Sequence, residues 1–410
     1  MRRKPLNTIY RSKLSKQAKQ LSSLAVQLSN SGSRLERRFW KKKLFSTLDP
    51  LLQGRSDLPL SQALEYLYDN DYKAYDQLAF AIENTVESPS LSDAEDLLLL
   101  AVPIMAWSTF NIPSGKIDQN TVDALTEALN QIVLSENTHL VLTNVLFSPD
   151  QLPETYTSAA ELARQLGGAA KDRLQVHINA DSLPETQHYL SDVRYLIGAV
   201  AVKKEQPVFK WQEESNFSTT GKEALLKKWQ TEGSARLQSL MPGCQIQLLL
   251  PNGLYNATRA AEKETRVYSV RASIAFLTTI LKIQTEHIRV TVGAFVEHGE
   301  VEEYRIGFSI NDSSDVVHGV VWPLIDEEYG NEPDPMYEKD VLSLPDHPVI
   351  RSTIVHLLKE VGIQKINVLE ERFSLEYCED CGSPLYPNPE GELLHAEFPE
   401  DADMPDNHLH

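Results

Sequence analysis

Apolar residues recur at three- and four-residue spacing near the start of the chain, with lysines between them, which is typical of an amphipathic helix. Leu14, Leu21 and Leu28 belong to this pattern. Ser33 and Glu36 have the spacing of a capping box, which predicts the start of a second helix. Similar patterns predict helices at 61–69, 71–86, 92–107 and 121–134. We therefore expect residues 1–135 to form an all-helical region.

From His139 onward, short apolar and β-branched runs alternate with helical patterns. The run LVLTNVLF predicts the first strand, and the segments 174–178, 207–211 and 245–251 predict three more. Helices are expected between them, at 155–166, 189–200 and 222–240. This alternation predicts a first α/β unit over residues 138–251.

A long helical pattern at 256–282 leads into the runs HIRVTVGAFV, EEYRIGFSI and VVHGVVWPL, which predict a three-strand meander. A helix at 349–360 and a strand at 366–375 follow, so a second α/β unit is expected over residues 252–376. The expected class is α+β or α/β, with the helical region packed on one or two mixed-sheet units. No Gly/Ser-rich or Pro-rich spacer separates the helical region from the first strand, so the two should pack directly.

The length of 410 residues exceeds one ordinary core, and the composition is that of a folded globular protein. No apolar run approaches the roughly 20 residues of a membrane span. The N-terminus has charges without the apolar stretch of a secretory signal, which predicts a cytoplasmic protein without membrane insertion. Three cysteines in that compartment do not form a disulfide framework.

The charge of −19 is unevenly distributed. Residues 1–45 hold thirteen Lys or Arg and one acid, a net +12, so the remaining 365 residues carry −31. Such a basic arm could bind nucleic acid or another anionic partner. We favour docking on the protein's own acidic body or on a second subunit, because that body would repel a polyanion. The cations concerned are Arg34, Arg37, Arg38, Lys41, Lys42 and Lys43.

The clearest chemical motif is the run CEDCG, with Cys378 and Cys381 as potential thiolate ligands. A tight turn between two such cysteines, with glycine after the second, is the arrangement of a zinc knuckle. A tetrahedral site needs two further ligands. We expect His395 as the third ligand, and His408 or His410 as the fourth. The alternative is a dimer in which two chains each contribute both thiolates.

Two other interpretations of the CxxC pair remain, a redox pair and two thiols without a special role. A redox pair normally opens a helix, whereas the prolines that follow Ser383 disfavour one. The expected site is therefore structural zinc, which would order a C-terminal knuckle and acidic, proline-rich tail over residues 377–410.

The sequence lacks the common catalytic signatures. Gly221 and Lys222 end a segment that resembles a phosphate-binding loop, but Asn216 and Glu223 replace its first glycine and its magnesium-binding hydroxyl. There is also no GxSxG elbow and no HExxH pair. His318 lies among apolar strand residues, which favours a structural histidine over a catalytic base.

Four segments resemble a bacterial family of about this length that is classed as a domain of unknown function: SGSRLERRFW, WSTFNIPSGKI, VVHGVVWPL and CEDCGSPLYPNPEGEL. The resemblance spans the whole chain and its last segment is similar to half of a zinc ribbon. It implies a bacterial, intracellular protein and carries no activity with it.

Two functions therefore stay open. The first is a non-enzymatic, zinc-binding assembly or regulatory protein, expected to form a two-fold dimer and to offer a site for a protein partner. The second is an enzyme with a ligand site at the edge of the α/β sheet. Its candidate polar groups are Arg271, Glu303, Arg305 and His318.

Overall fold

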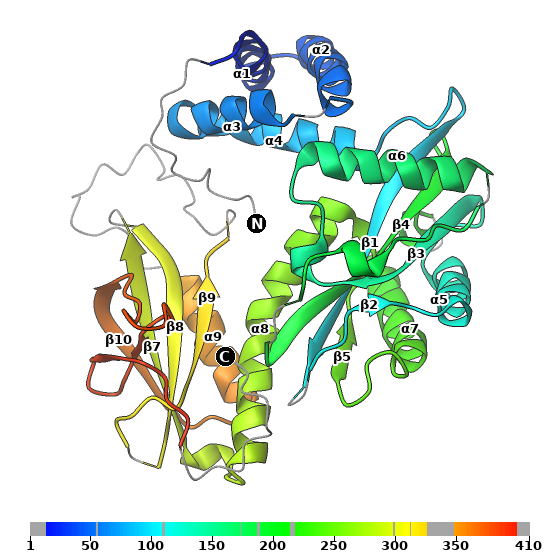
Figure 1. The fold of residues 1–410 in the computed structure, drawn as a ribbon. Coiled ribbons are helices and arrows are strands. Elements are labelled where there is room, and N and C mark those ends of the chain that lie inside the picture. Colours follow the sequence, from blue (N-terminus) through cyan, green and yellow to red (C-terminus); the bar gives the residue numbers. More distant parts are fainter. Residues whose placement is uncertain are drawn as a thin grey trace.

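The computed structural model describes residues 14–54, 56–108, 111–172, 174–186, 189–213, 218–297, 300–311, 313–325 and 348–399. Its helices and its antiparallel and mixed sheets confirm the α+β class (Figure 1). Four helices form an N-terminal bundle at one end: α1 (Lys16–Ser29), α2 (Arg34–Leu52), α3 (Leu58–Asn70) and α4 (Tyr72–Glu87). The Ser33 hydroxyl accepts a hydrogen bond from the Glu36 N–H at 3.2 Å, which confirms the predicted start of α2.

The first sheet is antiparallel and has the order β2-β3-β4-β1-β5, with β6 (Asn252–Gly253) also paired to β1. Its strands are β1 (Glu95–Trp107), β2 (Gly115–Lys116), β3 (Thr138–Phe147), β4 (Ser191–Lys203) and β5 (Gln245–Leu248). Helices α5 (Gln119–Ile132) and α7 (Thr219–Leu237) cover one face, while α6 (Tyr156–Asp172) covers the other face beside the bundle. The sheet is thus the middle layer of three.

The helix expected at 92–107 is wrong, because this segment is the central strand β1. Alternate residues of β1 enter two different cores, with Leu99 on one face and Leu100 on the other, so its apolar run lacks the alternation of a half-exposed strand. The helix expected near 189–200 is likewise β4, which pairs with β1 over its whole length. Residues 1–135 are therefore not all-helical: the bundle ends with α4.

Two predicted strands are also wrong. The segment 174–178 contributes one bridge, from Val176 to Thr143, and 207–211 contributes one bridge, from Phe209 to Leu134. The predicted βα alternation consequently gives way to antiparallel pairing in the first sheet. Strand β1 tolerates Pro103 at a place where the pairing is interrupted. The Pro103 carbonyl accepts a hydrogen bond from the Leu249 N–H, which lies between β5 and β6. The N–H that proline lacks therefore faces a gap in the hydrogen-bond ladder.

The second sheet has the order β10-β7-β8-β9 and confirms the predicted meander. Strands β7 (Ile288–Glu297), β8 (Glu300–Ile310) and β9 (His318–Pro323) are antiparallel, and β10 (Lys365–Ser374) adds to β7 in parallel. One face packs on α9 (Pro348–Glu360) and on the second half of α8 (Leu254–Ile280). The first half of α8 belongs to the core of the first sheet, so this helix joins the two sheets.

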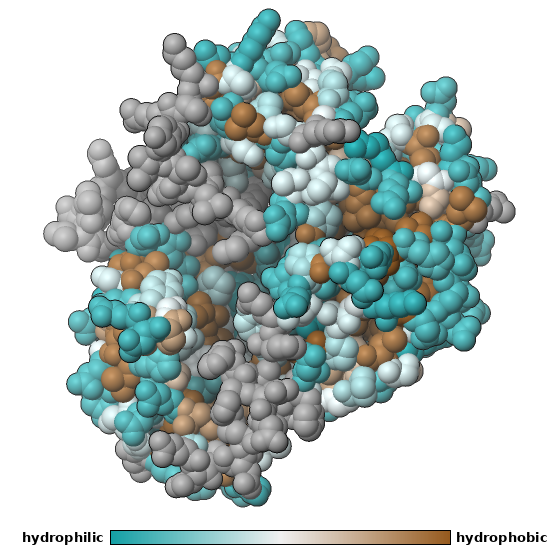
Figure 2. Space-filling view, in the orientation of Figure 1, coloured by the Kyte–Doolittle hydropathy of each residue, from teal (hydrophilic) through white to brown (hydrophobic). Residues whose placement is uncertain are grey.

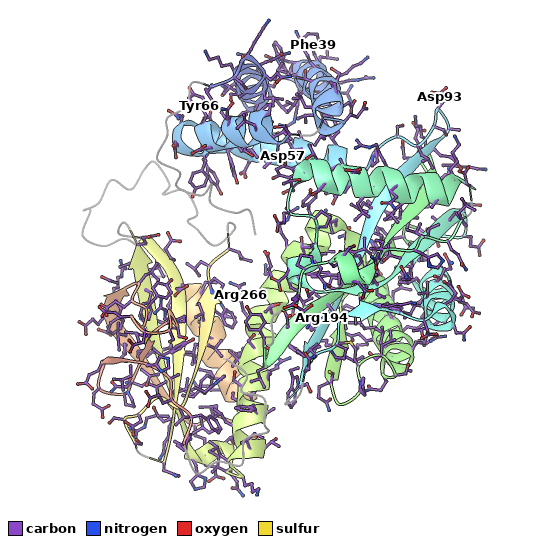
Figure 3. The ribbon with its side chains drawn as sticks, viewed as in Figure 1. Phe39, Asp57, Tyr66, Asp93, Arg194 and Arg266 are labelled. Atoms are coloured by element: carbon purple, nitrogen blue, oxygen red, sulfur yellow. The ribbon has the colours of Figure 1, made fainter. Side chains whose placement is uncertain are left out.

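Buried arginines tie neighbouring segments together (Figure 3). Arg194 of β4 donates to the carbonyls of Ile112 and Pro113, each at 2.9 Å, and pairs with Asp192. Arg266 of α8 donates to the Pro323 carbonyl at 2.9 Å, which holds the helix against β9. Both arginines satisfy buried carbonyls beyond the regular ladders.

The view in Figure 2 shows a largely hydrophilic surface on this face, with hydrophobic residues in small separate groups. Among the residues that the structure describes, no helix combines the length and the apolarity that crossing a membrane requires.

Candidate metal centre

A tight turn brings the two cysteines of the CEDCG run together. The Cys378 N–H donates to the Ser383 carbonyl at 2.8 Å, and the Gly382 N–H donates back to the Cys378 carbonyl at 2.8 Å. Gly382 has a φ of +73°, a left-handed conformation that glycine adopts without strain. The turn is the knuckle that the spacing predicts.

A short hairpin then returns the chain to this turn. It consists of β11 (Tyr386–Pro387) and β12 (Leu393–Leu394), and its loop is closed by Asn388. The buried Asn388 side chain accepts hydrogen bonds from the N–H groups of Glu390 and Glu392 at 3.0 and 2.8 Å. His395 follows β12 directly, so the hairpin places its imidazole beside the knuckle.

The three expected ligands meet at one point. One ligand atom each from Cys378, Cys381 and His395 lies within 4.8 Å of the other two, and the Cys381 Sγ is 3.3 Å from the His395 Nε2. A tetrahedral zinc ion would hold such atoms about 3.5 to 4 Å apart. The group could therefore hold a metal ion if the three ligand atoms moved slightly closer together.

The thiol chemistry agrees with this geometry. Hydrogen bonds from Ser383, and then from Cys378 and His395, lower the pKa of Cys381 to about 7. A thiol with this pKa is substantially ionised at neutral pH, and the thiolate is the form that binds a metal. Cys381 is exposed and Cys378 partly so, which places the centre at the protein surface.

A buried arginine anchors the knuckle from below. The fully buried Arg305 of β8 donates to the carbonyls of Glu376 and Leu385, at 2.6 and 2.8 Å, on either side of the turn. Its Nε donates to Glu303 at 2.6 Å, and its guanidinium lies over the ring of Tyr377 at 5.0 Å. Sequence reasoning placed Arg305 and Glu303 in a hypothetical active site and missed this role.

Glycines in the second sheet make room for the hairpin. A Cβ at Gly307 of β8 would lie 2.3 Å from the Pro387 carbonyl oxygen, and one at Gly319 of β9 would lie 2.3 Å from the ring of Tyr386. Gly307 and Gly319 are opposite each other in the sheet. These two glycines are visible in the sequence, but only the strand register shows that they lie side by side under the hairpin.

The four candidate polar groups of the enzyme hypothesis do not converge. His318 is opposite Phe308, whereas Arg305 is opposite Val321, so they project from opposite faces of the sheet. Arg271 of α8 pairs with Glu360 of α9 at 3.7 Å.

His318 is structural, as the sequence indicates. Its Nε2 is 2.9 Å from the Ser273 hydroxyl, and desolvation lowers its pKa to about 4. A neutral, packed imidazole of this kind holds β9 against α8.

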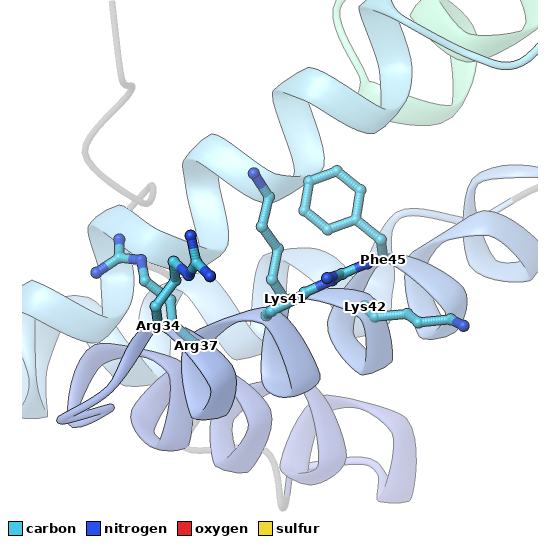
Figure 4. A pocket seen from close by; sticks show the side chains of 6 residues that line it. Arg34, Arg37, Lys41, Lys42 and Phe45 are labelled. Carbon is cyan, nitrogen blue, oxygen red and sulfur yellow. The ribbon is translucent and has the colours of Figure 1, made fainter.

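The six cations of the basic arm lie on α2, and their side chains are exposed. Five of them line one open pocket with Phe45: Arg34, Arg37, Arg38, Lys41 and Lys42 (Figure 4). None of the six forms an ion pair with a described residue, so the expected docking on the chain's own acidic body is not seen in the described ranges. His408 and His410 lie outside those ranges.

The fold and this centre define an α+β protein with a surface Cys-Cys-His group on a knuckle and hairpin. A family model described as a protein of unknown function, DUF2863, matches residues 7–409. The chain belongs to this family. No curated protein and no solved structure gave a significant match to the chain.

Proposed function

We propose that the protein is a non-enzymatic, zinc-binding assembly or regulatory protein whose zinc stabilises the C-terminal knuckle. The observation that carries this proposal is the meeting of Cys378, Cys381 and His395 within 4.8 Å on a turn and hairpin. Two thiolates and an imidazole are ligands that suit Zn²⁺, and the cytoplasmic location that the sequence predicts would keep both thiols reduced.

A structural role for the metal is supported by what surrounds the group. Arg305 binds carbonyls on both sides of the knuckle, so the sheet positions the ligands before any metal binds. The hairpin itself is docked on the second sheet through Tyr386 and Pro387. Zinc would then lock a preformed surface element instead of folding a disordered one.

An assembly or regulatory role is supported by the position of the knuckle. Its ligands are at the surface, and the adjacent Tyr377 side chain is half exposed, at 50%. A rigid, exposed element of this kind suits recognition by another protein or by a second copy of the chain. Of the polar groups considered for catalysis, Glu303 and Arg305 pair on one face of the second sheet and His318 lies on the other face, so the set does not favour the enzyme hypothesis.

Metal analysis of protein purified without a histidine tag or chelator tests the proposal. We expect about one zinc per chain in the single-chain site. Replacing both cysteine ligands, Cys378→Ser with Cys381→Ser, should remove the metal and expose the tail to protease. The main thermal transition should shift little.

The matched control is Cys244→Ala, which changes the remaining cysteine, buried beside α7 and far along the sequence from the knuckle. This variant should keep its zinc. A wild-type protein without zinc, or a double variant that keeps it, would refute the proposal.

A further inference from the structure

Helix α2 presents an unusual concentration of positive charge to solvent. Residues 34–43 contain six Lys or Arg and one acid, Glu36. The buried residues of this helix, Leu44, Leu48 and Leu52, all lie in its C-terminal half. Its N-terminal half packs against the core through the partly buried Trp40, and its cations are exposed.

Five of these six cations, all but Lys43, line an open groove with a volume of about 490 Å³ (Figure 4). Arg37 is oriented there by a hydrogen bond from its guanidinium to Gln77 of α4, at 3.0 Å. The ammonium of Lys41 lies 5.5 Å from the ring centre of Phe45, which forms part of the groove wall. Contacts within the bundle thus hold Arg37 and Lys41 at the groove, while the side chains of Arg34, Arg38 and Lys42 are exposed to solvent.

The repulsion among these charges is not relieved by the described chain. Within the described ranges, the six cations have no ion-pair partner. The single acid among them, Glu36, accepts a hydrogen bond from the Gly32 N–H at 3.2 Å. An anionic ligand would relieve this repulsion, and guanidinium groups favour phosphate because they donate two parallel hydrogen bonds.

We infer that the α2 groove binds the phosphodiester backbone of single-stranded nucleic acid. Arg34, Arg38 and Lys42 recur every four residues, which places a cation about every 6 Å along the helix axis. Such a row suits a repeating chain of phosphates more than one isolated phosphate. Phe39 follows Arg38 in the sequence and is 57% exposed, and the Lys43 ammonium lies 5.9 Å from its ring centre. An exposed aromatic ring beside a cation is the element on which single-stranded bases stack.

Other occupants fit the groove less well. Few apolar residues of α2 are free to enter a lipid surface. Leu35 and Phe39 are exposed, whereas Leu44, Leu48 and Leu52 are buried and Trp40, Phe45 and Leu51 pack partly buried against the core of the bundle. The acidic surface of a second copy would use the cations but would leave Phe39 without a role. Nucleic acid uses both the charges and the ring.

The acidic remainder of the chain does not prevent this binding. Charges separated by more than about 8 Å are largely screened at physiological ionic strength. Figure 1 shows α2 at the outer end of the molecule, on the bundle and away from the second sheet. Its cations therefore act locally.

Fluorescence anisotropy with a labelled single-stranded oligonucleotide, measured across a series of salt concentrations, tests the inference. The triple variant Arg34→Gln, Arg38→Gln, Lys42→Gln should bind at least tenfold more weakly at low salt. Removing three phosphate contacts should also flatten the slope of log K against log salt by about 2. Phe39→Ala should weaken binding roughly tenfold without changing that slope, because stacking does not release counterions.

The control variant Lys222→Gln, Lys227→Gln, Lys228→Gln removes the same number of charges from α7 and should bind like the wild type. Equal loss in both triple variants would show that net charge alone matters and would overturn the inference. Absence of binding at low salt would overturn it, as would binding of anionic vesicles in place of the oligonucleotide. If the α2 triple variant instead dissociates a dimer in light scattering and the wild type ignores the oligonucleotide, the groove is a self-association surface.

Discussion

The carboxylate of Glu87, the last residue of α4, accepts a hydrogen bond from the backbone N–H of Tyr255 in the first turn of α8, at 3.1 Å. Gly253, the N-cap residue of α8, has no side chain to satisfy these amides, and a Cβ there would lie 2.7 Å from the carboxylate. Glu87 therefore caps a helix that begins more than 160 residues later, and so joins the bundle to the helix that spans both sheets.

This contact predicts a pH dependence of stability. Burial raises the pKa of Glu87 to about 7, because desolvation outweighs the hydrogen bond from Tyr255. The folded protein then retains a proton that the unfolded chain releases above its ordinary pKa of 4.5. The contribution of Glu87 to the free energy of unfolding is fully present below pH 4.5 and is lost as the pH rises through about 7.

Replacing Glu87 with Gln should remove this component. We expect Glu87→Gln to flatten the decline in unfolding free energy between about pH 5 and about pH 8, a change on the order of 2 kcal/mol. Urea unfolding at several pH values measures it. Glu161→Gln, at an exposed position of α6, is the control and should leave the profile unchanged. An unaltered profile in Glu87→Gln would mean that this carboxylate is ionised in the folded protein.

A second cap joins two other helices, and its loss should be measurable. The Asp57 carboxylate, at the start of α3, accepts from the N–H groups of Tyr156 and Thr157 of α6, at 2.7 and 3.0 Å (Figure 3). Asp57→Ala should cost about 1 to 2 kcal/mol in unfolding free energy, because two helix-end donors lose their acceptor. Asp93→Ala, at an exposed aspartate before β1, should cost little. Equal effects of the two variants would contradict the role of Asp57.

The glycines under the hairpin predict a local effect. Gly307→Ala would place a methyl group 2.3 Å from the Pro387 carbonyl oxygen, so the hairpin must move away from the sheet. We expect faster proteolysis after β10 and weaker zinc retention, with the rest of the fold intact. Gly168→Ala is the matched control, since a Cβ there meets nothing within 4 Å. Wild-type protease resistance in Gly307→Ala would show that the hairpin is not held by this contact.

His395 distinguishes a single-chain metal site from a shared one. If His395 is the third ligand, His395→Ala should weaken zinc binding by at least tenfold, because outer-shell changes alone commonly cost that much. Competition with a coloured chelator measures the affinity, and light scattering follows the oligomeric state. His356→Ala, at an exposed histidine of α9, should have no effect. Undiminished zinc in His395→Ala, together with a dimer that dissociates on chelation, would favour a site of four thiolates from two chains.

Segments whose own pattern decides their structure were predictable from the sequence. Helix α8 and the meander β7 to β9 lie close to their expected positions, and the Ser33 cap of α2 forms as its spacing indicates. The Cys378 and Cys381 knuckle and the histidine beside it also followed from residue spacing. In each case the information lies within a few neighbouring residues, because turns, caps and amphipathic periods are local properties.

What depends on distant partners was decided only by the tertiary structure. The segments of β1 and β4 look helical or ambiguous alone, and they become strands because they pair with each other and are buried on both faces. Arg305 is an anchor for the knuckle only because the sheet register brings it under carbonyls 71 and 80 residues away. The sequence by itself determined the local elements and the Cys-Cys-His group that could hold a metal. Long-range pairing and burial decided which strand is central and which residues anchor that group.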